Sequence, residues 1–433
     1  MCSIITSSAF RRPRTFPRRA FLKNPVAAAN VFQRRKSENA EIQDQKAARR
    51  QKTLIDPKIA MKYENVCVEA IECALPPEIV TTDELENRLA PLYERLKLPF
   101  GRLELMTGIQ ERGLWERGRL PGDQSVDTVE KLLRTTGVDR SKIGMFVHAS
   151  VCRDYQEPAT ACDVHRRLGL PQSAVIFDLS NACLGLLTGA LQIANAIELG
   201  QIDAGIVVGT ETSRALMETT VDELVADETL TRRTVKDAFA SLTIGSGSAA
   251  ILLTNRSLSR TGNRLLGASV LANTEQSALC RSQVDVTAGG RSDGQTMKTD
   301  SETLLREGVA VAAKAFERFV AEIGWDATAL DRVFCHQVGK AHQKLLFETF
   351  GLDDAKNFAT FPLLGNTGSV ALPTAAALGI ESGFARPGDK LGLFGIGSGI
   401  NVVLAALDWK TTLPSSAPTP PETLARFLAL NAG

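Results

Sequence analysis

Short apolar runs alternate with helical patterns along most of this chain. Val175, Ile176 and Phe177 form one such run. After a short turn, apolar residues recur at steps of three and four: Leu184, Leu187, Leu191, Ala194 and Ile197. This pattern predicts a buried strand at 175–177 and a helix that Gly200 ends. Cys183 would lie where the strand gives way to the helix.

The same reasoning predicts an alternating series of strands and helices from residue 61 to 409. Strands are expected at 66–75, 143–150, 204–208, 242–253, 265–272, 332–335, 390–396 and 400–406, and helices at 82–96, 125–136, 159–168, 300–323, 340–350 and 373–383. Because buried strands alternate with helices, we expect α/β architecture with largely parallel sheets covered on both faces. The pattern restarts near residue 255, which predicts two duplicated halves, 61–255 and 256–410.

Both ends differ from this body. Residues 1–60 have a net charge of +10 and little periodicity, so we expect a disordered basic extension. It is either a loose tail or sequence upstream of a true start at Met61. A third reading, export through the twin arginines at 18–19, is disfavoured because the apolar stretch behind them is short. Residues 411–433 form a Pro-, Ser- and Thr-rich tail, expected to be loose as far as residue 423.

Composition narrows the class of protein. The chain has 433 residues, 44% hydrophobic and 23% charged, as in soluble globular proteins. Residues 61–433 have a net charge of −9, which gives no sign of nucleic-acid binding. No apolar run is long enough for a membrane span. The eight cysteines show no paired spacing and suit a reducing compartment, so we expect a cytoplasmic protein.

The position of Cys183 suggests nucleophilic chemistry. The first N–H groups of a helix are unpaired and its dipole end is positive, so we expect the thiol to ionise readily. Small neighbours at Ala182, Gly185 and Gly189 leave room for a substrate. The competing interpretation is a buried structural cysteine, which is common for free Cys.

Two further candidates lie in the second half. His336 directly follows a short apolar strand, where ligands bind in open α/β sheets. Asn366 stands in the loop Gly365–Gly368. A Cys nucleophile, a His base and an Asn donor form a coherent set for acyl transfer through a thioester. The glycines at 395–399 lie between two strands and no Walker sequence occurs, so neither a nucleotide cofactor nor a metal is expected.

Four motifs in register resemble the thiolase-superfamily condensing enzymes of the ketoacyl synthase III type. They are Asn181-Ala182-Cys183, His336-Gln337-Val338, Gly365-Asn366-Thr367-Gly368 and Gly395-Ile396-Gly397-Ser398-Gly399. The resemblance covers nearly all of 61–409. The loop 150–158 and the pair Glu211-Thr212 are similar to the OleA family, whose members condense fatty acyl chains head to head in bacterial olefin biosynthesis.

This resemblance implies a five-layered αβαβα fold, a homodimer and fatty acyl-CoA substrates. It implies that Cys183 carries the acyl group and that the N–H groups of Cys183 and Ser398 bind the oxyanion. Glu157, entering the partner's active site, would remove a proton from the second acyl-CoA. His336 and Asn366 would bind the enolate oxygen. An acyl carrier protein and downstream hydrocarbon-pathway enzymes are further candidate partners.

Two alternatives remain open. An ordinary ketoacyl synthase III would use the same Cys183, His336 and Asn366 but draw its carbanion from decarboxylation of malonyl-carrier protein. Glu157 separates the two, because a non-decarboxylative condensation needs a base. Without the resemblance, Glu157 would be read as a solvated loop carboxylate. A catalytically silent scaffold of this fold is the non-enzyme alternative.

Overall fold

The computed structural model describes residues 61–286 and 292–432, so the predicted extension at 1–60 lies outside the described residues. The strands are β1 (Met61–Lys62), β2 (Val66–Ala74), β3 (Glu78–Thr81), β4 (Glu111–Leu114), β5 (Ile143–His148), β6 (Val175–Asp178), β7 (Ala204–Glu211), β8 (Gly247–Asn255), β9 (Arg264–Ala272), β10 (Cys280–Val286), β11 (Ser292–Thr299), β12 (Arg332–Cys335), β13 (Lys390–Gly397) and β14 (Asn401–Asp408). The α-helices are α2 (Thr82–Arg88), α3 (Ala90–Leu96), α4 (Arg102–Thr107), α5 (Pro121–Thr136), α6 (Thr160–Leu168), α7 (Gly185–Glu198), α8 (Arg214–Ala226), α9 (Ser301–Ile323), α10 (Lys340–Phe350), α11 (Phe361–Leu364), α12 (Ala371–Glu381) and α13 (Pro421–Leu430). Short 3-10 turns are η1 (Arg140–Lys142), η2 (Thr234–Thr243), η3 (Thr274–Gln276), η4 (Asp354–Lys356) and η5 (Gly368–Val370).

Most strands join one mixed sheet. Its order is β12-β13-β14-β9-β2-β8-β7-β5-β6, with β1 paired to β9. The pairs β5/β6, β5/β7 and β12/β13 are parallel, whereas β2/β8, β7/β8, β9/β14 and β13/β14 are antiparallel. The prediction of largely parallel sheets is therefore wrong. An apolar run indicates only that a strand is buried on both faces. Antiparallel strands in the middle of a covered sheet are buried in the same way, so the run does not reveal the direction of the strand.

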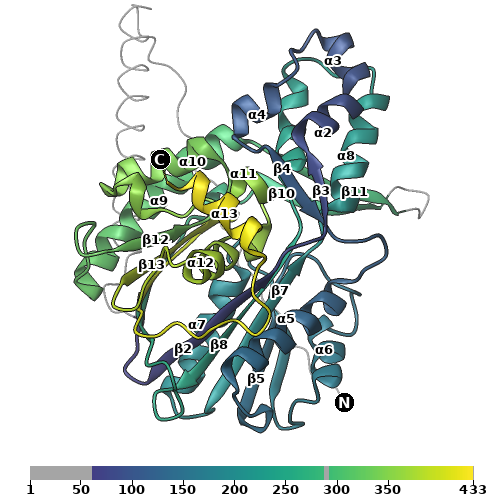
Figure 1. Ribbon diagram of the computed structural model, residues 1–433. Helices are drawn as coiled ribbons and strands as arrows, with labels where there is room; N and C mark the ends of the chain where they lie inside the picture. Colours follow the sequence, from purple (N-terminus) through teal and green to yellow (C-terminus); the bar gives the residue numbers. More distant parts are fainter. Residues whose placement is uncertain (1–60, 287–291, 433) are drawn as a thin grey trace, which may run out of the picture. The chain divides into compact units, whose positions relative to one another are not determined.

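Helices cover the sheet in layers (Figure 1). α5 packs against β2, β7 and β8, and α9 packs against β9, β13 and β14. α7 and α12 lie between the two halves of the sheet, β12-β13-β14-β9 and β2-β8-β7-β5-β6. α12 contacts β2 and β8 as well as β12 and β13, and α7 contacts β7 and β8 while its Leu187 lies against Gly395 of β13. The outer helices, the two halves of the sheet, and α7 with α12 between them give the expected αβαβα layering.

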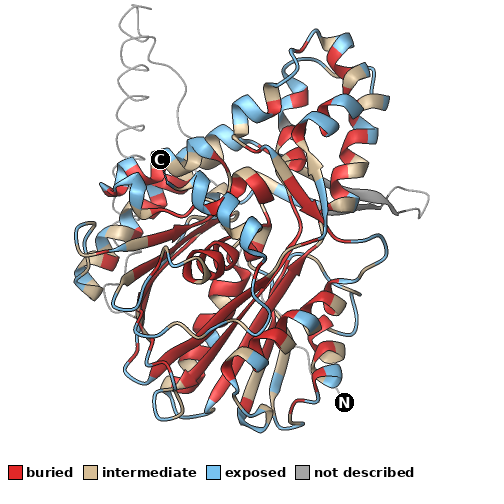
Figure 2. Cartoon of the chain, in the orientation of Figure 1, coloured by how far each residue is buried: buried red, intermediate tan, exposed pale blue. Residues whose placement is uncertain are grey.

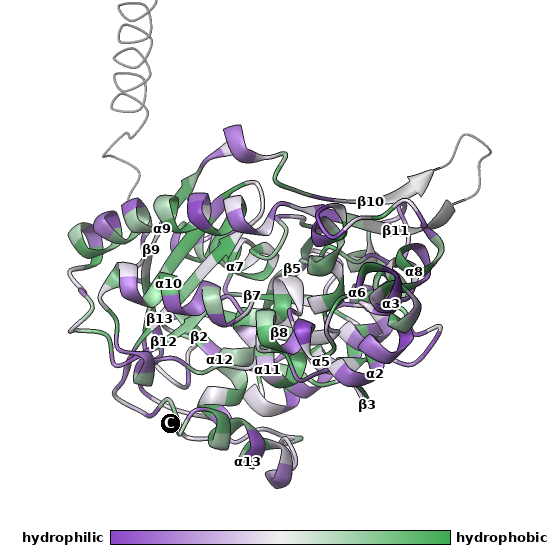
Figure 3. Cartoon of the chain, turned by 90° about the horizontal axis from the view of Figure 1, so that it is seen from above, coloured by the Kyte–Doolittle hydropathy of each residue, from purple (hydrophilic) through white to green (hydrophobic). Residues whose placement is uncertain are grey.

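The central and outer helices differ in burial as this layering requires. α12 is buried at every position from Ala371 to Ile380, and Figure 2 shows it buried all round. α9 starts after the N-cap Asp300, ends at Gly324 and buries one side only, so it presents polar and apolar residues on different faces (Figure 3). A helix enclosed between the two halves of the sheet has no side that faces solvent, whereas an outer helix has one.

β6 is an edge strand and not the buried strand that its sequence predicts. It pairs with β5 alone within the described sheet, and Val175 is 51% exposed. Ile176 and Phe177 are partly exposed. An exposed apolar edge is a template for pairing with another chain.

Residues 410–432, which we call the C-terminal strap, are held along their length. Asn263 accepts hydrogen bonds from the N–H groups of Lys410 and Thr411 (2.7 and 2.9 Å). Farther along, Ser415 bonds to Glu72 of β2 and Ser416 bonds to α5. Thr419 bonds to α12, and Asn431 bonds to the segment before α11. Phe427 is 1% exposed. The expectation of a loose segment at 411–423 is therefore wrong.

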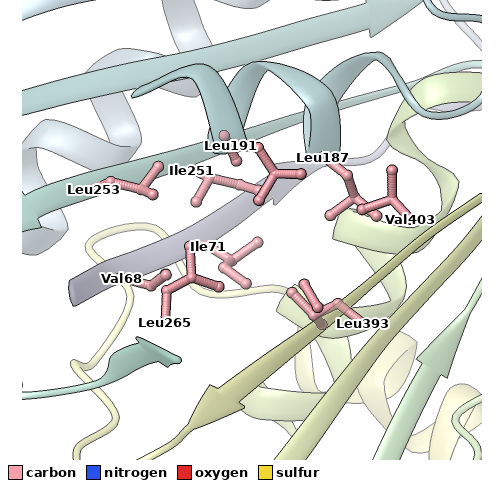
Figure 4. Close-up of a pocket in the computed structure, with 11 residues that line it drawn as sticks. Val68, Ile71, Leu187, Leu191, Ile251, Leu253, Leu265, Leu393 and Val403 are labelled. Atoms are coloured by element: carbon pink, nitrogen blue, oxygen red, sulfur yellow. The ribbon is translucent and has the colours of Figure 1, made fainter. Parts of the chain in front are cut away.

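A small apolar cavity, about 20 Å³, lies beneath α7. Leu187 and Leu191 line it from the helix, and strand residues including Ile71, Leu393 and Val403 line it from below (Figure 4). A void of this size removes packing contacts from every side chain around it.

We expect Val403→Ile to fill part of this cavity. One added methylene should raise the free energy of unfolding by about 0.8 kcal/mol and the melting temperature by about 1–2 °C. Calorimetry of the two proteins measures the change. Val402→Ile is the matched control, because Val402 lies on the same strand but packs in the core cluster beneath α9 and does not line this cavity. An equal gain in both variants would contradict the assignment to the cavity.

Candidate active site

Cys183 lies at the junction between β6 and α7, as predicted. α7 begins at Gly185 with Leu184 as its N-cap, so Cys183 directly precedes the helix. Ala182 has φ = 45°, a left-handed conformation that side chains other than glycine rarely adopt. This sharp turn fixes where the backbone presents the cysteine.

The ionisation predicted for Cys183 is wrong. Burial, with smaller contributions from Cys280 and Glu211, raises the pKa of its thiol to about 12. Cys183 precedes the N-cap, and the loss of hydration outweighs the attraction of the helix terminus. The sequence signal was local to the helix, whereas the burial comes from distant segments.

One of these segments is the turn after β13. A Cβ atom on Gly397 would lie 3.6 Å from the Cys183 nitrogen, and one on Gly395 would collide with Leu184. The glycines therefore let β13 approach the start of α7, and they place the next residue, the partly buried Ser398, beside the same turn.

Two asparagines, of which the sequence analysis missed Asn401, tie this turn to the cysteine loop. The Asn401 side chain donates to Asn181 Oδ1 (3.0 Å) and to the Ser398 carbonyl (3.3 Å). Asn181 in turn donates to Thr188 Oγ1 of α7 (2.9 Å). Asn181 stands in a motif already singled out, but the sequence gave no sign of its partner at the start of β14.

His336 follows β12 and is 4% exposed. Its backbone N–H donates to the carbonyl of Phe394 (3.1 Å), which places it beside β13. Nδ1 has no hydrogen-bond partner within the described residues. Burial, with a smaller contribution from His342, lowers the pKa of His336 to about 3. The imidazole is therefore neutral at physiological pH, and its Nδ1 is left without a partner for a substrate or an attacking group to use.

His342, near the start of α10, packs its ring near that of His336. The ring centroids are 6.4 Å apart and the planes are nearly perpendicular. Burial lowers the pKa of His342 to about 4. Its place in the first turn of α10, facing inward, was hidden by the polar residues around it in the sequence.

Asn366 lies in a tightly packed loop. Its backbone pairs with Thr243 and Gly245, and its side-chain Oδ1 accepts from the Gly368 N–H (3.0 Å). This bond leaves the side-chain NH₂, which has no acceptor in the described part of the chain, for an oxygen of a substrate. A Cβ on Gly185 would lie 3.4 Å from the Cβ of Ser369, so the start of α7 and the end of this loop are adjacent.

Glu157 stands apart from these residues. It is exposed, in the loop between β5 and α6, and none of the described contacts joins it to Cys183, His336 or Asn366 of the same chain. Val151 and Tyr155 of the same loop are 42% and 60% exposed. His148, directly before this loop, is 1% exposed and is bonded to Ser125 (3.1 Å), so it is a core histidine with its own partner.

Two observations concern other kinds of site. Within 61–286 and 292–432, no group of three or more His, Cys, Asp or Glu side chains is placed to hold a metal ion. None of the helices described there is long and apolar enough to cross a bilayer.

Comparison with known proteins connects this arrangement to a family. Residues 109–261 match the thiolase N-terminal domain, and residues 320–409 match the C-terminal domain of 3-oxoacyl-[acyl-carrier-protein] synthase III. The chain is 42% identical over 352 residues to the acyl-CoA:acyl-CoA alkyltransferase of Shewanella oneidensis, covering 81% of this chain and 100% of that protein. The chain belongs to the acyl-CoA:acyl-CoA alkyltransferase (OleA) family.

Other OleA family members agree. The Xanthomonas campestris alkyltransferase is 32% identical over 349 residues, covering 81% of this chain and all of that protein. A cysteine-to-serine variant of X. campestris OleA, solved with bound lauric acid and lauroyl-CoA, superposes with a TM-score of 0.75 at 32% identity, over 80% of this chain and all of the other. The resemblance and the thiolase-like fold predicted from the sequence are confirmed, and the chain is a condensing acyltransferase of the thiolase superfamily. The roles of individual site residues stay predictions.

Proposed function

We propose that this protein joins two fatty acyl-CoA molecules by a non-decarboxylative Claisen condensation and forms a 2-alkyl-3-oxoacyl product. The observation that carries the proposal is the similarity to the alkyltransferase of S. oneidensis over the whole length of that protein. Acyl-CoA is the only small molecule that the proposed steps need, and the cytoplasm is the compartment that we propose for them.

The first step transfers an acyl group to Cys183. Because burial holds the pKa of the thiol at about 12, a base must take the proton as the sulfur attacks the thioester. We assign this role to the neutral imidazole of His336, whose protonation becomes more favourable as negative charge forms on the sulfur. The new S–C bond replaces the S–C bond to CoA, and CoA leaves with the proton. The N–H groups of Cys183 and Ser398 stabilise the oxyanion.

The second step forms the carbon–carbon bond. The α-carbon of a second acyl-CoA loses a proton to Glu157 and becomes an enolate. The Asn366 NH₂ group and His336 donate hydrogen bonds to the enolate oxygen. The carbanion then attacks the acyl group on Cys183, and the thiolate leaves. Since no carbon dioxide is lost, the base is indispensable.

A homodimer would supply Glu157 from the partner. The exposed apolar edge of β6 is suited to pairing with a second copy across a twofold axis. Val151 and Tyr155, exposed on the loop that carries Glu157, would be covered by the same association. An acyl carrier protein and later enzymes of a hydrocarbon pathway are candidate partners beyond the dimer.

Product analysis with two differently labelled fatty acyl-CoAs tests the proposal. Without any malonyl donor, we expect mass spectrometry to detect a 2-alkyl-3-oxoacyl product that carries both labels, because each acyl group enters intact. Dependence on malonyl-carrier protein, with one carbon dioxide released per product, would instead identify an ordinary ketoacyl synthase III. That second candidate is favoured by the match of residues 320–409.

A further inference from the structure

One buried carboxylate joins two loops of the proposed active site. Glu211 is the last residue of β7 and is 6% exposed. Its Oε1 accepts hydrogen bonds from the N–H of Val151 (3.0 Å) and from the N–H and hydroxyl of Ser369 (3.3 and 2.5 Å). Its Oε2 accepts from the N–H of Cys152 (3.2 Å). Neutral donors thus hold this buried charge, and no described Lys or Arg forms an ion pair with it.

The two loops carry the groups proposed for the second step. Val151 and Cys152 open the loop that leads to Glu157, and Ser369 closes the loop that carries Asn366. Contact is close on the Asn366 side, since a Cβ on Gly368 would lie 3.3 Å from the Glu211 side chain. One carboxylate therefore sets the spacing between the two loops.

Further bonds make the start of the Glu157 loop rigid. The Ser150 hydroxyl donates to the carbonyl of Cys152 (2.7 Å), and Asp154 accepts from the N–H of Gly122 (2.7 Å). A shift at Glu211 would consequently be passed along the loop and would not be absorbed within it. A displacement of about 1 Å is enough to cost up to about a hundredfold in rate when reacting groups must be aligned.

The charge of Glu211 also reaches sulfur atoms of the site. The pKa of Cys152 is raised by burial and then by Glu211. The pKa of Cys183 is raised by burial, then by Cys280 and Glu211. Among the described residues, Cys280 and Glu211 are the groups whose charge raises the pKa of Cys183, and Glu211 also accepts a hydrogen bond from the N–H of Cys152.

We propose that Glu211 is a positioning residue that aligns the Glu157 loop with the Asn366 loop, so that condensation depends on its length and charge while the extent of Cys183 acylation does not. The inference rests on the function proposed above. It predicts that the two steps respond differently when Glu211 changes, and that the nucleophile senses the charge directly.

Two variants separate length from charge. Glu211→Asp keeps the charge and shortens the side chain, and Glu211→Gln keeps the length and removes the charge and one acceptor. We expect both to lower condensation by about tenfold to a hundredfold, while the acyl adduct on Cys183 still forms with wild-type stoichiometry. Glu218→Gln is the matched control, because this carboxylate pairs with Arg117 and Arg214 outside the two loops.

The rate at which iodoacetamide alkylates Cys183 measures the effect of the Glu211 charge on the thiol without any catalytic turnover. When the pKa lies far above the pH, the rate follows the small thiolate fraction. Removing the Glu211 charge lowers the pKa of Cys183, so Glu211→Gln should react faster than wild type at pH 8. Glu211→Asp should react at the wild-type rate. A purely structural defect would change both variants alike.

Three results would overturn the proposal. They are condensation by Glu211→Gln within twofold of wild type, loss of the Cys183 adduct together with condensation, and equal alkylation rates in Glu211→Gln and wild type. If Glu211→Gln does not fold, Ser369→Ala removes one donor to the same carboxylate and should lower condensation alone. Failure of the proposed function looks different, since wild type itself would then give no product while the alkylation comparison still decides the charge coupling.

Discussion

Replacing Cys183 with alanine should abolish the acyl adduct and lower condensation by at least about a thousandfold. The thiol is the group on which both steps depend, and the sharp turn at Ala182 presents it at the start of α7. Intact-mass spectrometry after incubation with one long-chain acyl-CoA measures the adduct, and product analysis with two acyl-CoAs measures condensation.

Cys280→Ala is the matched control for this variant. Cys280 is the other cysteine whose charge affects Cys183, and Thr299 is bonded to its sulfur (3.4 Å). We expect this control to keep the adduct and the condensation. An adduct that persists in Cys183→Ala would show that another residue carries the acyl group, and it would end the proposed mechanism.

Glu157→Gln should lower condensation by at least about a hundredfold and leave acylation of Cys183 unchanged. The amide keeps the size of the side chain but cannot take the α-proton. Exchange of the α-protons of bound acyl-CoA with D₂O reports that proton transfer directly and should fall in parallel. Gln156→Ala, one residue earlier in the same exposed loop, is the control and should behave as wild type.

Mixed dimers test whether Glu157 acts across the subunit interface. When Cys183→Ala and Glu157→Gln chains are mixed at random, half of the dimers contain one of each. In those dimers one of the two sites combines an intact Cys183 with an intact Glu157 from the partner. We therefore expect about one quarter of the wild-type activity. No recovery would place Glu157 in the active site of its own chain.

Local sequence signals predicted the elements whose ends are set locally. α9 starts at an Asp300 cap and ends at a glycine, and β12 and α10 have the predicted bounds. The direction of neighbouring strands was not predictable. β13 and β14 are antiparallel, but their apolar sequences would look the same in a parallel pair joined by a crossover. The exposure of β6 was hidden for a similar reason, since an apolar run does not reveal how many neighbours a strand has.

The sequence predicted the candidate site residues but not the long-range contacts between them. Cys183 and His336 each follow a strand, and Asn366 stands in a glycine-rich loop after α11, so their local sequence context singled them out. The pKa of Cys183 depends instead on residues far along the chain, such as Gly397 of β13 and the carboxylate of Glu211. Links such as Asn401 to Asn181 join positions 220 residues apart and leave no local pattern.

The C-terminal strap has a practical consequence for anyone who handles this protein. Asn431 both donates to and accepts from Ala359, which lies directly before α11 and the Asn366 loop. An affinity tag fused directly after the last helix would disturb the hydrogen bonds between Asn431 and Ala359. Truncation before Pro421 would remove Phe427 and expose the apolar surface around Phe358 that it covers. Affinity tags therefore belong at the other end, and shortened versions made for crystallisation should keep the last helix.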